Sequence, residues 1–391
     1  MSNSVDLRAP RKNTGTDCFA VERKNMLGNG VGGIQPGVRL ALGLMSGTSL
    51  DGIDAALLWT DGLTVAQTGA SLTVPYENDL RDALRGILGG TGTVADVERR
   101  VTEAHAEAVL RLTHQENLTT DELSVIGFHG HTILHRPRDG RTWQIGDGAL
   151  LARLTGIDVI CDMRSNDVAH GGEGAPLAPL YHVAMCSDLE KPVAILNLGG
   201  VANLTWVGQD DEDPFAFDTG PGNALMDEWV ERHTGERFDR NGALAGDGRV
   251  DRGRLKRLLD NAYFDATPPK SLDRIDFDLT VIDGLTAADG AATLAAFTCE
   301  TVARAVRFLP VPPRRWLVTG GGRHNPVLMT GLAQCLGAPV EPIEAIGWDG
   351  DAVEAQAFAY LAIRSLDGLP LTLPTTTGVS APVTGGRHFS R

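Results

Sequence analysis

The sequence is poor in cysteine, in aromatic residues and in basic charge. Its five cysteines are odd in number and never form a C-x-x-C pair, which argues against a disulfide framework or a cysteine zinc site and favours a reducing compartment. Lysine and arginine total 35 against 50 acidic residues, a net charge of −15. A chain this acidic is a poor candidate for binding the phosphate backbone of a nucleic acid. The cysteines are Cys18, Cys161, Cys186, Cys299 and Cys335.

Long hydrophobic runs are missing as well. No stretch reaches the roughly 18 apolar residues of a transmembrane helix, and the first residues lack the apolar core of a signal peptide. We therefore expect a soluble, cytoplasmic protein without a membrane partner. Glycine, in contrast, is abundant, with 47 of 391 residues. This abundance predicts many tight turns and sites lined by backbone.

Residues 1–38 are polar and rich in turn-forming residues, which predicts a mobile leader outside the fold. A G-x-G-x-x-G stretch occurs within them at residues 28–33. A dinucleotide-binding motif needs a strand before it and a helix after it, and neither flank has that pattern. We interpret this stretch as part of the leader.

From residue 39 onward the chain contains a pattern that occurs twice. Each copy runs strand, glycine turn, strand, strand and helix, and the copies begin about 150 residues apart, which indicates two homologous domains rather than a solenoid. A long helix is expected at 280–308, a strand at 315–319, and an amphipathic helix at 351–366 that crosses back to the first domain. The predicted domains are 39–163 with 350–380, and 164–349. The first copy comprises strands at 39–45, 53–59 and 64–74, helices at 78–88 and 94–117, and a further buried strand at 124–128. The second comprises strands at 192–197, 202–207 and 215–217 with a helix at 223–233.

Three glycine-rich turns follow predicted strands, at residues 46–49, 198–200 and 320–322. Glycine lets backbone N–H groups approach a phosphate closely, and hydroxyl groups add donors. No G-x-x-x-x-G-K-[ST] motif is present, so a P-loop is excluded. The turns predict a nucleotide cleft between two domains, although three unrelated structural turns would give the same pattern.

Several motifs together resemble one known family. Residues 44–54 (LMSGTSLDGID) resemble the first phosphate motif of anhydro-N-acetylmuramic acid kinases, which belong to the sugar kinase, Hsp70 and actin fold superfamily. The likeness continues in order through residues 162–177, 197–203, 217–223, 268–271 and 319–325. It implies an α/β fold of two duplicated ribonuclease-H-like, actin-like ATPase domains around a central cleft.

The resemblance also implies an activity in peptidoglycan recycling and amino sugar catabolism. The enzyme would open 1,6-anhydro-N-acetylmuramic acid with water and phosphorylate its 6-oxygen, giving N-acetylmuramate 6-phosphate and ADP. Its cofactors would be ATP and Mg²⁺, its partner a small-molecule sugar, and its assembly a homodimer. Nucleotide-binding residues would be Gly47, Thr48, Ser49, Leu50, Asp51, Gly52, Ile53, Asp54, Gly199, Gly200, Asn203, Gly320, Gly321, Gly322 and Asn325. Sugar-binding residues would be Arg164, Asp167, Gly222 and Asn223.

Two acidic residues are candidates for catalysis. Asp218 follows a short predicted strand and precedes Thr-Gly-Pro-Gly, so we expect it in a turn near a helix N-terminus, where its carboxylate would stay ionised as the base that activates water. The alternative is a cap of the following helix. Glu354 resembles the family glutamate that reaches the sugar, and the alternative is an exposed helical side chain. Arg164 would pair with the lactyl carboxylate and Asp167 would accept hydrogen bonds, unless the two form a structural ion pair.

His129, His131 and His135 suggest a metal site, since residues i and i+2 of a strand share a face. No third ligand follows in register, and family members commonly have Gln at the position of His131. Met45 also stands where the wider superfamily has Asp. Magnesium would then interact with Asp51, Asp54 or Asp218 through waters.

Two other function classes remain open at this point. A non-catalytic ATP-switching protein of the same fold would have no use for the residues of a sugar pocket. A metal hydrolase would use His129 and His131.

Overall fold

The computed structural model describes residues 37–47, 50–209, 212–272 and 277–391. Most of the expected leader, with its glycine-rich stretch and Cys18, lies outside the described residues, as do Thr48 and Ser49. Within the described ranges, no helix combines the length and apolarity that crossing a membrane requires. Residues Arg39–Arg391 form one compact unit.

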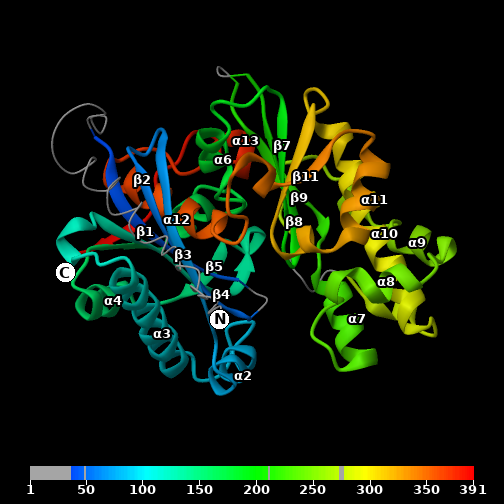
Figure 1. Cartoon of the computed structure of the whole chain (residues 1–391), viewed down its shortest axis with the longest axis horizontal. Helices are drawn as coiled ribbons and strands as arrows, with labels where there is room; N and C mark the ends of the chain where they lie inside the picture. The colour runs from blue at the N-terminus through cyan, green and yellow to red at the C-terminus, as the bar shows by residue number, and fades with distance from the viewer. Residues whose placement is uncertain (1–36, 48–49, 210–211, 273–276) are drawn as a thin grey trace, which may run out of the picture. The chain divides into compact units, whose positions relative to one another are not determined.

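The first sheet has seven strands in the order β12-β6-β4-β1-β2-β3, with β5 paired to β4 (Figure 1). Strands β1, β2 and β3 form antiparallel pairs, whereas β1, β4 and β6 run parallel. The final strand, β12, pairs antiparallel with β6. The strands are β1 (Arg39–Ser46), β2 (Gly52–Thr60), β3 (Val65–Pro75), β4 (Val125–Arg136), β5 (Arg141–Ile145), β6 (Val159–Cys161) and β12 (Arg387–Phe389).

The second sheet repeats this arrangement in the order β11-β10-β7-β8-β9. Again the first three strands are antiparallel and the other two run parallel to the first. The repeated order confirms the expected α/β fold of two ribonuclease-H-like sheets. The strands are β7 (Val193–Leu198), β8 (Val201–Val207), β9 (Phe215–Pro221), β10 (Arg315–Thr319) and β11 (Val340–Pro342).

The central strands are almost continuously apolar because both of their faces are buried. Leu40, Leu42 and Leu44 of β1 belong to one apolar cluster, and Ala41 belongs to another. In the same way, alternate residues of β7 contribute to different clusters. This is the two-residue period of a strand. Each sheet therefore has a core of its own on one face and shares a third core on the other.

Helices α2 (Asn78–Gly86), α3 (Val94–Gln115) and α4 (Gly148–Thr155) pack against the first sheet, and α7 (Ala224–Thr234), α10 (Ala287–Ala305) and α11 (Pro326–Leu336) pack against the second (Figure 1). The shared core contains α6 (Pro179–Met185) and α12 (Val353–Leu366). The remaining α-helices are α5 (Ser165–Ala169), α8 (Ala243–Asp247), α9 (Arg252–Leu258) and α13 (Pro374–Thr377).

Helix α12 returns to the first sheet as expected, but it is not amphipathic. Ten consecutive residues, 355–364, are buried. A Cβ atom at Gly43 of β1 would overlap the Ala355 carbonyl oxygen, and one at Gly127 of β4 would overlap that of Phe358. These two glycines let the helix backbone lie directly on the sheet, while α6 and the second sheet add to the same core.

Three further segments differ from the sequence expectations. Residues 280–308 do not form one helix, because a 3₁₀ turn at Leu279–Ile282 precedes α10. Strand β4 continues to Arg136, and β9 continues to Pro221.

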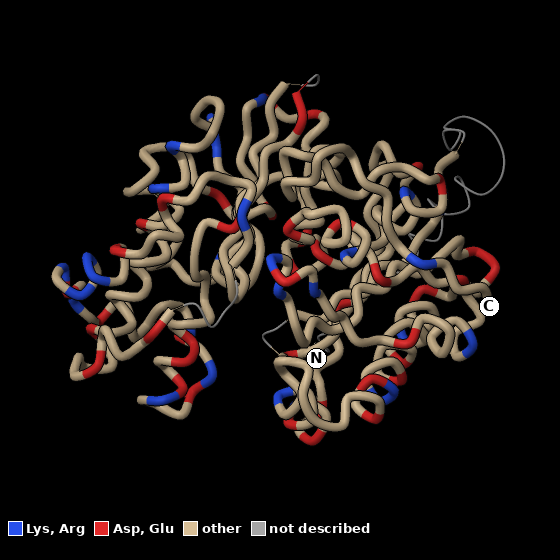
Figure 2. Tube along the Cα trace, turned by 180° about the vertical axis from the view of Figure 1, so that it is seen from behind, with Lys and Arg blue, Asp and Glu red and all other residues tan. Residues whose placement is uncertain are grey.

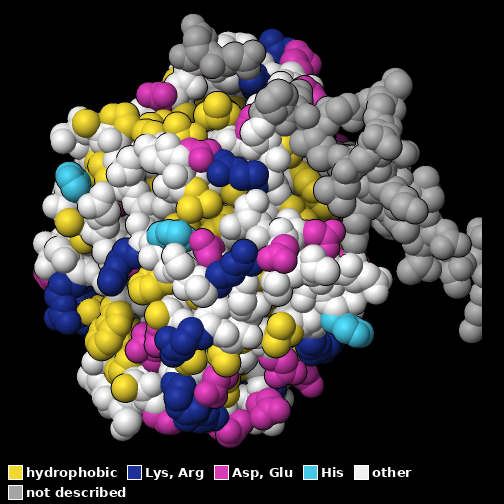
Figure 3. Space-filling view, turned by 90° about the vertical axis from the view of Figure 1, so that its left-hand side faces the viewer, with side chains coloured by type: hydrophobic (Ala, Val, Ile, Leu, Met, Phe, Trp, Pro, Cys, Tyr) yellow, Lys and Arg dark blue, Asp and Glu magenta, His cyan; other side chains and the backbone are white. Residues whose placement is uncertain are grey.

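Acidic and basic positions are interspersed along the trace (Figure 2), and the face in Figure 3 mixes apolar with charged side chains.

Candidate active site

The turn between β7 and β8 is joined to the beginning of α7. Gly222 N and Ala224 N donate to the Gly200 carbonyl at 3.0 and 3.2 Å, and Asn223 N donates to the Gly199 carbonyl at 2.7 Å. A Cβ atom at Gly222 would overlap the Gly199 oxygen, so only glycine allows this approach. Two of the predicted phosphate-binding and sugar-binding segments are therefore neighbours.

The third glycine turn packs against the same region. Gly320 has a φ of 72°, and a Cβ atom there would overlap the Asn197 side chain. Asn223 donates from Nδ2 to the Leu198 carbonyl at 2.8 Å, while its Oδ1 is buried without a hydrogen-bond partner. A Cβ atom at Gly321 would meet no atom nearer than Asn223 Nδ2 at 3.9 Å. A side chain at Gly321 would therefore meet Asn223 only at ordinary contact distance, and Asn223 Oδ1 is a buried acceptor without a protein partner.

The residues that flank the first glycine turn hold its two ends in place. Leu50 N donates to the Gly47 carbonyl at 3.2 Å, and Leu50 holds a left-handed φ of 59° with its side chain in the core. Ser46 Oγ lies 2.6 Å from the Tyr76 hydroxyl and 2.8 Å from His131 Nδ1. His131 thus supports the strand that leads into the turn.

Glu354 lies where the two sheets meet. It projects from the first turn of α12, and its Oε1 accepts a hydrogen bond from Asn197 Nδ2 at 3.2 Å. Burial raises the pKa of Glu354, and the Asp51 charge raises it further, whereas Arg164 and the Asn197 hydrogen bond lower it. The side chain is therefore not the exposed helical glutamate of the alternative interpretation.

Asp54 of β2 shares this acidic environment. Thr73 Oγ1 donates to its Oδ1 at 2.6 Å, yet burial raises the pKa of Asp54 to about 7, with further upward contributions from Asp51, Glu354 and Asp351. Carboxylates that repel one another in this way favour a cation. Across the described ranges, no three His, Cys, Asp or Glu side chains are grouped to hold a metal ion directly. Asp54 and Glu354 are therefore the buried carboxylates that a hydrated cation could interact with.

Asp218 lies inside β9, four residues into a seven-residue strand, and not in a turn as expected. Its Oδ2 accepts a hydrogen bond from Leu272 N at 2.8 Å, so it does not cap α7. Burial raises the pKa of Asp218 to about 7, against the lowering effects of the Leu272 hydrogen bond and of Arg164. The expectation of a carboxylate kept ionised by a helix N-terminus is therefore wrong, because desolvation dominates.

Arg164 connects the candidate catalytic residues electrostatically. Its guanidinium donates to His129 Nε2 at 3.0 and 3.2 Å and to the Gly174 carbonyl at 2.7 Å. Burial lowers the pKa of Arg164 to about 10, although Glu354 and Asp218 both act to raise it. His129 must be neutral to accept these bonds, and burial and the Arg164 charge lower its pKa well below the usual value. His129 thus orients Arg164.

Asp167 is a structural anchor in this geometry. It is buried, and its two oxygens accept hydrogen bonds from Gly174 N and Thr377 Oγ1, both at 2.6 Å. The Arg164 guanidinium bonds instead to the Gly174 carbonyl and to His129 Nε2. Arg164 and Asp167 therefore do not form the structural ion pair of the alternative interpretation.

Asn325 and Asn203 also have local roles. Asn325 Oδ1 caps α11 by accepting from Val327 N at 3.0 Å, and its buried Nδ2 has no hydrogen-bond partner. Asn203 lies opposite Asp218 in the β8–β9 register. Gly52 and Ile53 begin β2, with Ile53 in the core.

Residues of the 263–272 segment hold Asp218 from both sides, a role that no sequence pattern predicted. Asp218 N donates to the Lys270 carbonyl at 3.0 Å, and Ser271 Oγ donates to Glu173 at 2.6 Å. The Tyr263 hydroxyl donates to the Asp218 carbonyl at 2.6 Å, and Lys270 Nζ lies 4.4 Å from the Tyr263 ring centre. In the sequence, only the Pro-Pro-Lys-Ser motif at residues 268–271 pointed to this segment. The residue types of that motif alone do not indicate contacts with Asp218.

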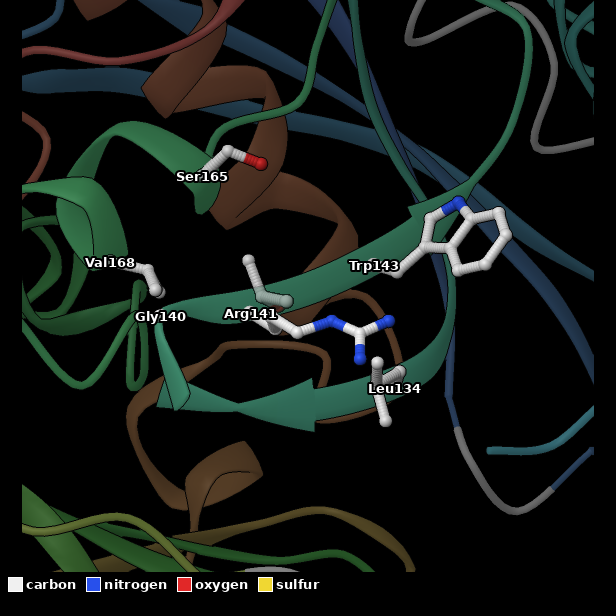
Figure 4. A pocket seen from close by; sticks show the side chains of 7 residues that line it. Leu134, Gly140, Arg141, Trp143, Ser165 and Val168 are labelled. Carbon is white, nitrogen blue, oxygen red and sulfur yellow. The ribbon is translucent and has the colours of Figure 1, made fainter. Parts of the chain in front are cut away.

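A cavity of about 260 Å³ lies beside the segment that carries Arg164. Figure 4 shows Leu134, Arg141 and Trp143 on the β4–β5 hairpin, with Ser165 and Val168 on the facing segment. Trp143 is 38% exposed, so this wall of the cavity reaches solvent.

Comparison with known proteins gives consistent matches over the described fold. The model of the family "Anhydro-N-acetylmuramic acid kinase" matches residues 39–391. The chain is similar to the anhydro-N-acetylmuramic acid kinase of Paramagnetospirillum magneticum, with 58% identity over 352 residues that cover 89% of this chain and 99% of the relative. It is similar to that of Rhodospirillum rubrum with 54% identity, covering 89% and 94%. A third relative, from Rhizorhabdus wittichii, is 53% identical, with coverage of 89% and 98%.

Proposed function

Because this chain belongs to the anhydro-N-acetylmuramic acid kinase family, we propose that it uses ATP and water to convert 1,6-anhydro-N-acetylmuramic acid into N-acetylmuramate 6-phosphate and ADP. Water adds to the anomeric carbon, the bond from that carbon to the 6-oxygen breaks, and the freed 6-oxygen attacks the γ-phosphate. The water proton leaves through a base. Such a reaction belongs to the recycling of peptidoglycan and the catabolism of amino sugars.

The buried carboxylate of Asp218 is the observation that carries this proposal. A general base works best with a pKa near the operating pH, and burial raises the pKa of Asp218 to about 7. Leu272 N occupies Oδ2, which leaves Oδ1 to take the proton of the attacking water. The Lys270–Leu272 segment fixes the carboxylate in place on both its backbone and its side chain.

Arg164 and Glu354 act on the sugar beside this base. Arg164 supplies positive charge for the lactyl carboxylate, and His129 and Gly174 hold its guanidinium in one orientation. Glu354, on α12, contacts the sugar, and the hydrogen bond from Asn197 Nδ2 orients its carboxylate. Asp167 acts by holding the Gly172–Gly174 loop, and so positions Arg164 rather than the sugar. Gly222 and Asn223 complete the sugar side.

ATP phosphates bind between the Gly47–Ser49 and Gly199–Gly200 turns, with the adenosine near Gly320–Gly322. Mg²⁺, held through water by Asp51 and Asp54, would neutralise charge on the transferred phosphate. The domain division into 39–163 with 350–380 and 164–349, a homodimeric assembly and a cytoplasmic location complete the proposal. A non-catalytic ATP switch gains nothing from a buried base beside an arginine, so the catalytic function is the better account.

The test is a reaction in oxygen-18 water with ATP, Mg²⁺ and 1,6-anhydro-N-acetylmuramic acid, followed by mass spectrometry of the product. We expect one ¹⁸O at C1 and one phosphate at the 6-oxygen of the same molecule. A parallel reaction with N-acetylmuramic acid, which has no anhydro bond to open, is the control. Release of ADP without a phosphorylated sugar, or a product that lacks ¹⁸O at C1, would overturn the proposal.

A further inference from the structure

Arg323 makes an unusual set of contacts just after the third glycine turn. Its side chain is 2% exposed, and its guanidinium uses all three nitrogens. Nη1 donates to the Gly320 carbonyl at 3.0 Å and Nε to Glu344 Oε1 at 2.8 Å, and Nη2 forms an ion pair with Asp351 Oδ1 at 2.8 Å. Only the fork of an arginine can reach three acceptors in these directions.

Two of these contacts are with the segment that leads into α12. Asp351 is three residues before Glu354, and Glu344 Oε1 also accepts from Gly350 N at 3.2 Å. A Cβ atom at Gly350 would overlap Arg323 Nε, so the backbone there fits closely around the guanidinium. The third contact is the turn itself, through Gly320. Arg323 therefore ties the third glycine turn to the segment that carries Glu354.

A second link joins the same two segments through Asn197. Its Nδ2 donates to Glu354, and its Oδ1 accepts from Thr319 Oγ1 at 3.3 Å, one residue before Gly320. The Glu354 carboxylate and the third turn are thus held at a fixed separation by two independent sets of bonds. A fold that needed only to anchor α12 already does so through Gly43 and Gly127.

We propose that Arg323 is a positioning residue, which sets the Glu354 carboxylate in register with the nucleotide held at the Gly320–Gly322 turn. This inference rests on the proposed function, since it gives nucleotide and sugar to the two linked segments. Loosening the link lets Glu354 and the nucleotide move relative to one another. Displacement of about 1 Å from productive geometry costs about 100-fold in rate, so the turnover number should respond more strongly than either binding step.

The test removes the link without unfolding the protein. Asp351 is 64% exposed, and Asp351→Asn leaves Arg323 its bonds to Glu344 and Gly320. The matched control is Glu341→Gln. Glu341 is 41% exposed and forms an ion pair at 2.7 Å with Arg315, which lies on β10, the strand before the turn. The variant removes the carboxylate of that pair. Arg323→Lys is a third variant, because lysine keeps the charge and loses the fork.

We expect kcat to fall by about tenfold in Asp351→Asn and by about 100-fold in Arg323→Lys, with unchanged KM for the sugar, and no change in Glu341→Gln. Asp351→Glu should recover part of the loss. Melting temperatures should be alike for Asp351→Asn and the control. Equal kcat values in Asp351→Asn and Glu341→Gln, or equal weakening of both substrates, would overturn the inference. Failure of the proposed function is distinct, because the wild type itself would then form no sugar phosphate.

Discussion

Asp218→Asn separates the charge of the candidate base from its shape. The amide oxygen of asparagine can still accept the hydrogen bond from Leu272 N. General-base catalysis contributes about 10²–10⁴-fold, so kcat should fall by that factor with a smaller change in KM. Ring opening and phosphorylation should fail together, because the 6-oxygen becomes a nucleophile only as the anhydro bond breaks. In the wild type, kcat should rise with pH through about 7 as the carboxyl ionises.

The same substitution should stabilise the protein at alkaline pH. Burial raises the folded-state pKa of Asp218 from 3.8 to about 7. The stability that this carboxyl contributes is therefore complete below pH 3.8 and is lost as the pH rises through about 7. At about 1.4 kcal/mol per unit the full loss is about 4 kcal/mol. Asparagine has no charge to bury, so after a deduction for its weaker hydrogen bond we expect a gain of about 1–3 kcal/mol at pH 8.

The assay is urea unfolding of the wild type and the variant from pH 5 to pH 8.5, with kcat measured on the same preparations. Asp167→Asn is the matched control, because both oxygens of that buried carboxylate accept hydrogen bonds. Its amide can still accept from Gly174 N and donate to the Thr377 hydroxyl, but two hydrogen bonds to a charged group become bonds to a neutral one, so it should lose about 1–3 kcal/mol. A near-normal kcat in folded Asp218→Asn, or a loss of stability like that of Asp167→Asn, would refute the reasoning and move the base to Glu354.

The remaining predictions concern glycines. Gly321→Val adds a side chain whose Cβ would meet only Asn223, at ordinary contact distance, so the fold should persist while the KM for ATP rises about tenfold, or about 1.4 kcal/mol, and sugar binding changes less. Steady-state kinetics with each substrate varied would check this, and equal loss of both would point to misfolding. Gly127→Ala should destabilise the fold by about 1–3 kcal/mol or more, because its Cβ would overlap the Phe358 carbonyl. Gly86→Ala, with no atom within 4 Å of the new Cβ, is its control in thermal unfolding and should be neutral or stabilising.

The sheets could be predicted because their central strands are buried on both faces. Strands β1 and β7 are short apolar runs, and each precedes a glycine turn, so the repeat was visible without any contact information. The end of β9 could not be predicted in this way, because Asp-Thr-Gly-Pro-Gly is typical of a turn. Strand β9 is at the edge of its sheet, where a proline such as Pro221 costs no ladder hydrogen bond. Gly220 also packs closely against Thr301 of α10, which keeps the chain extended.

The candidate site was predictable where a motif carried it and not where distant contacts did. Asp218, Glu354 and Arg164 stand in motifs of a known family, so resemblance could name them. Arg323 could not be given a role, because its partners Glu344 and Asp351 meet it only in the folded chain. The pKa values near 7 were also beyond prediction, since burial sets them and local sequence suggested the opposite for Asp218.

The three charged groups at the centre of the site share an unfavourable environment. The pKa values of Asp218 and Glu354 are raised and that of Arg164 is lowered, so burial pushes each toward its uncharged form. Asp167 is also buried, but both of its oxygens accept hydrogen bonds that hold the backbone or a side chain in place. A fold gains nothing by keeping charges that it must desolvate and only partly satisfies. Groups of this kind are retained for chemistry, and a switch that only bound ATP would not need an arginine between two protonatable carboxylates.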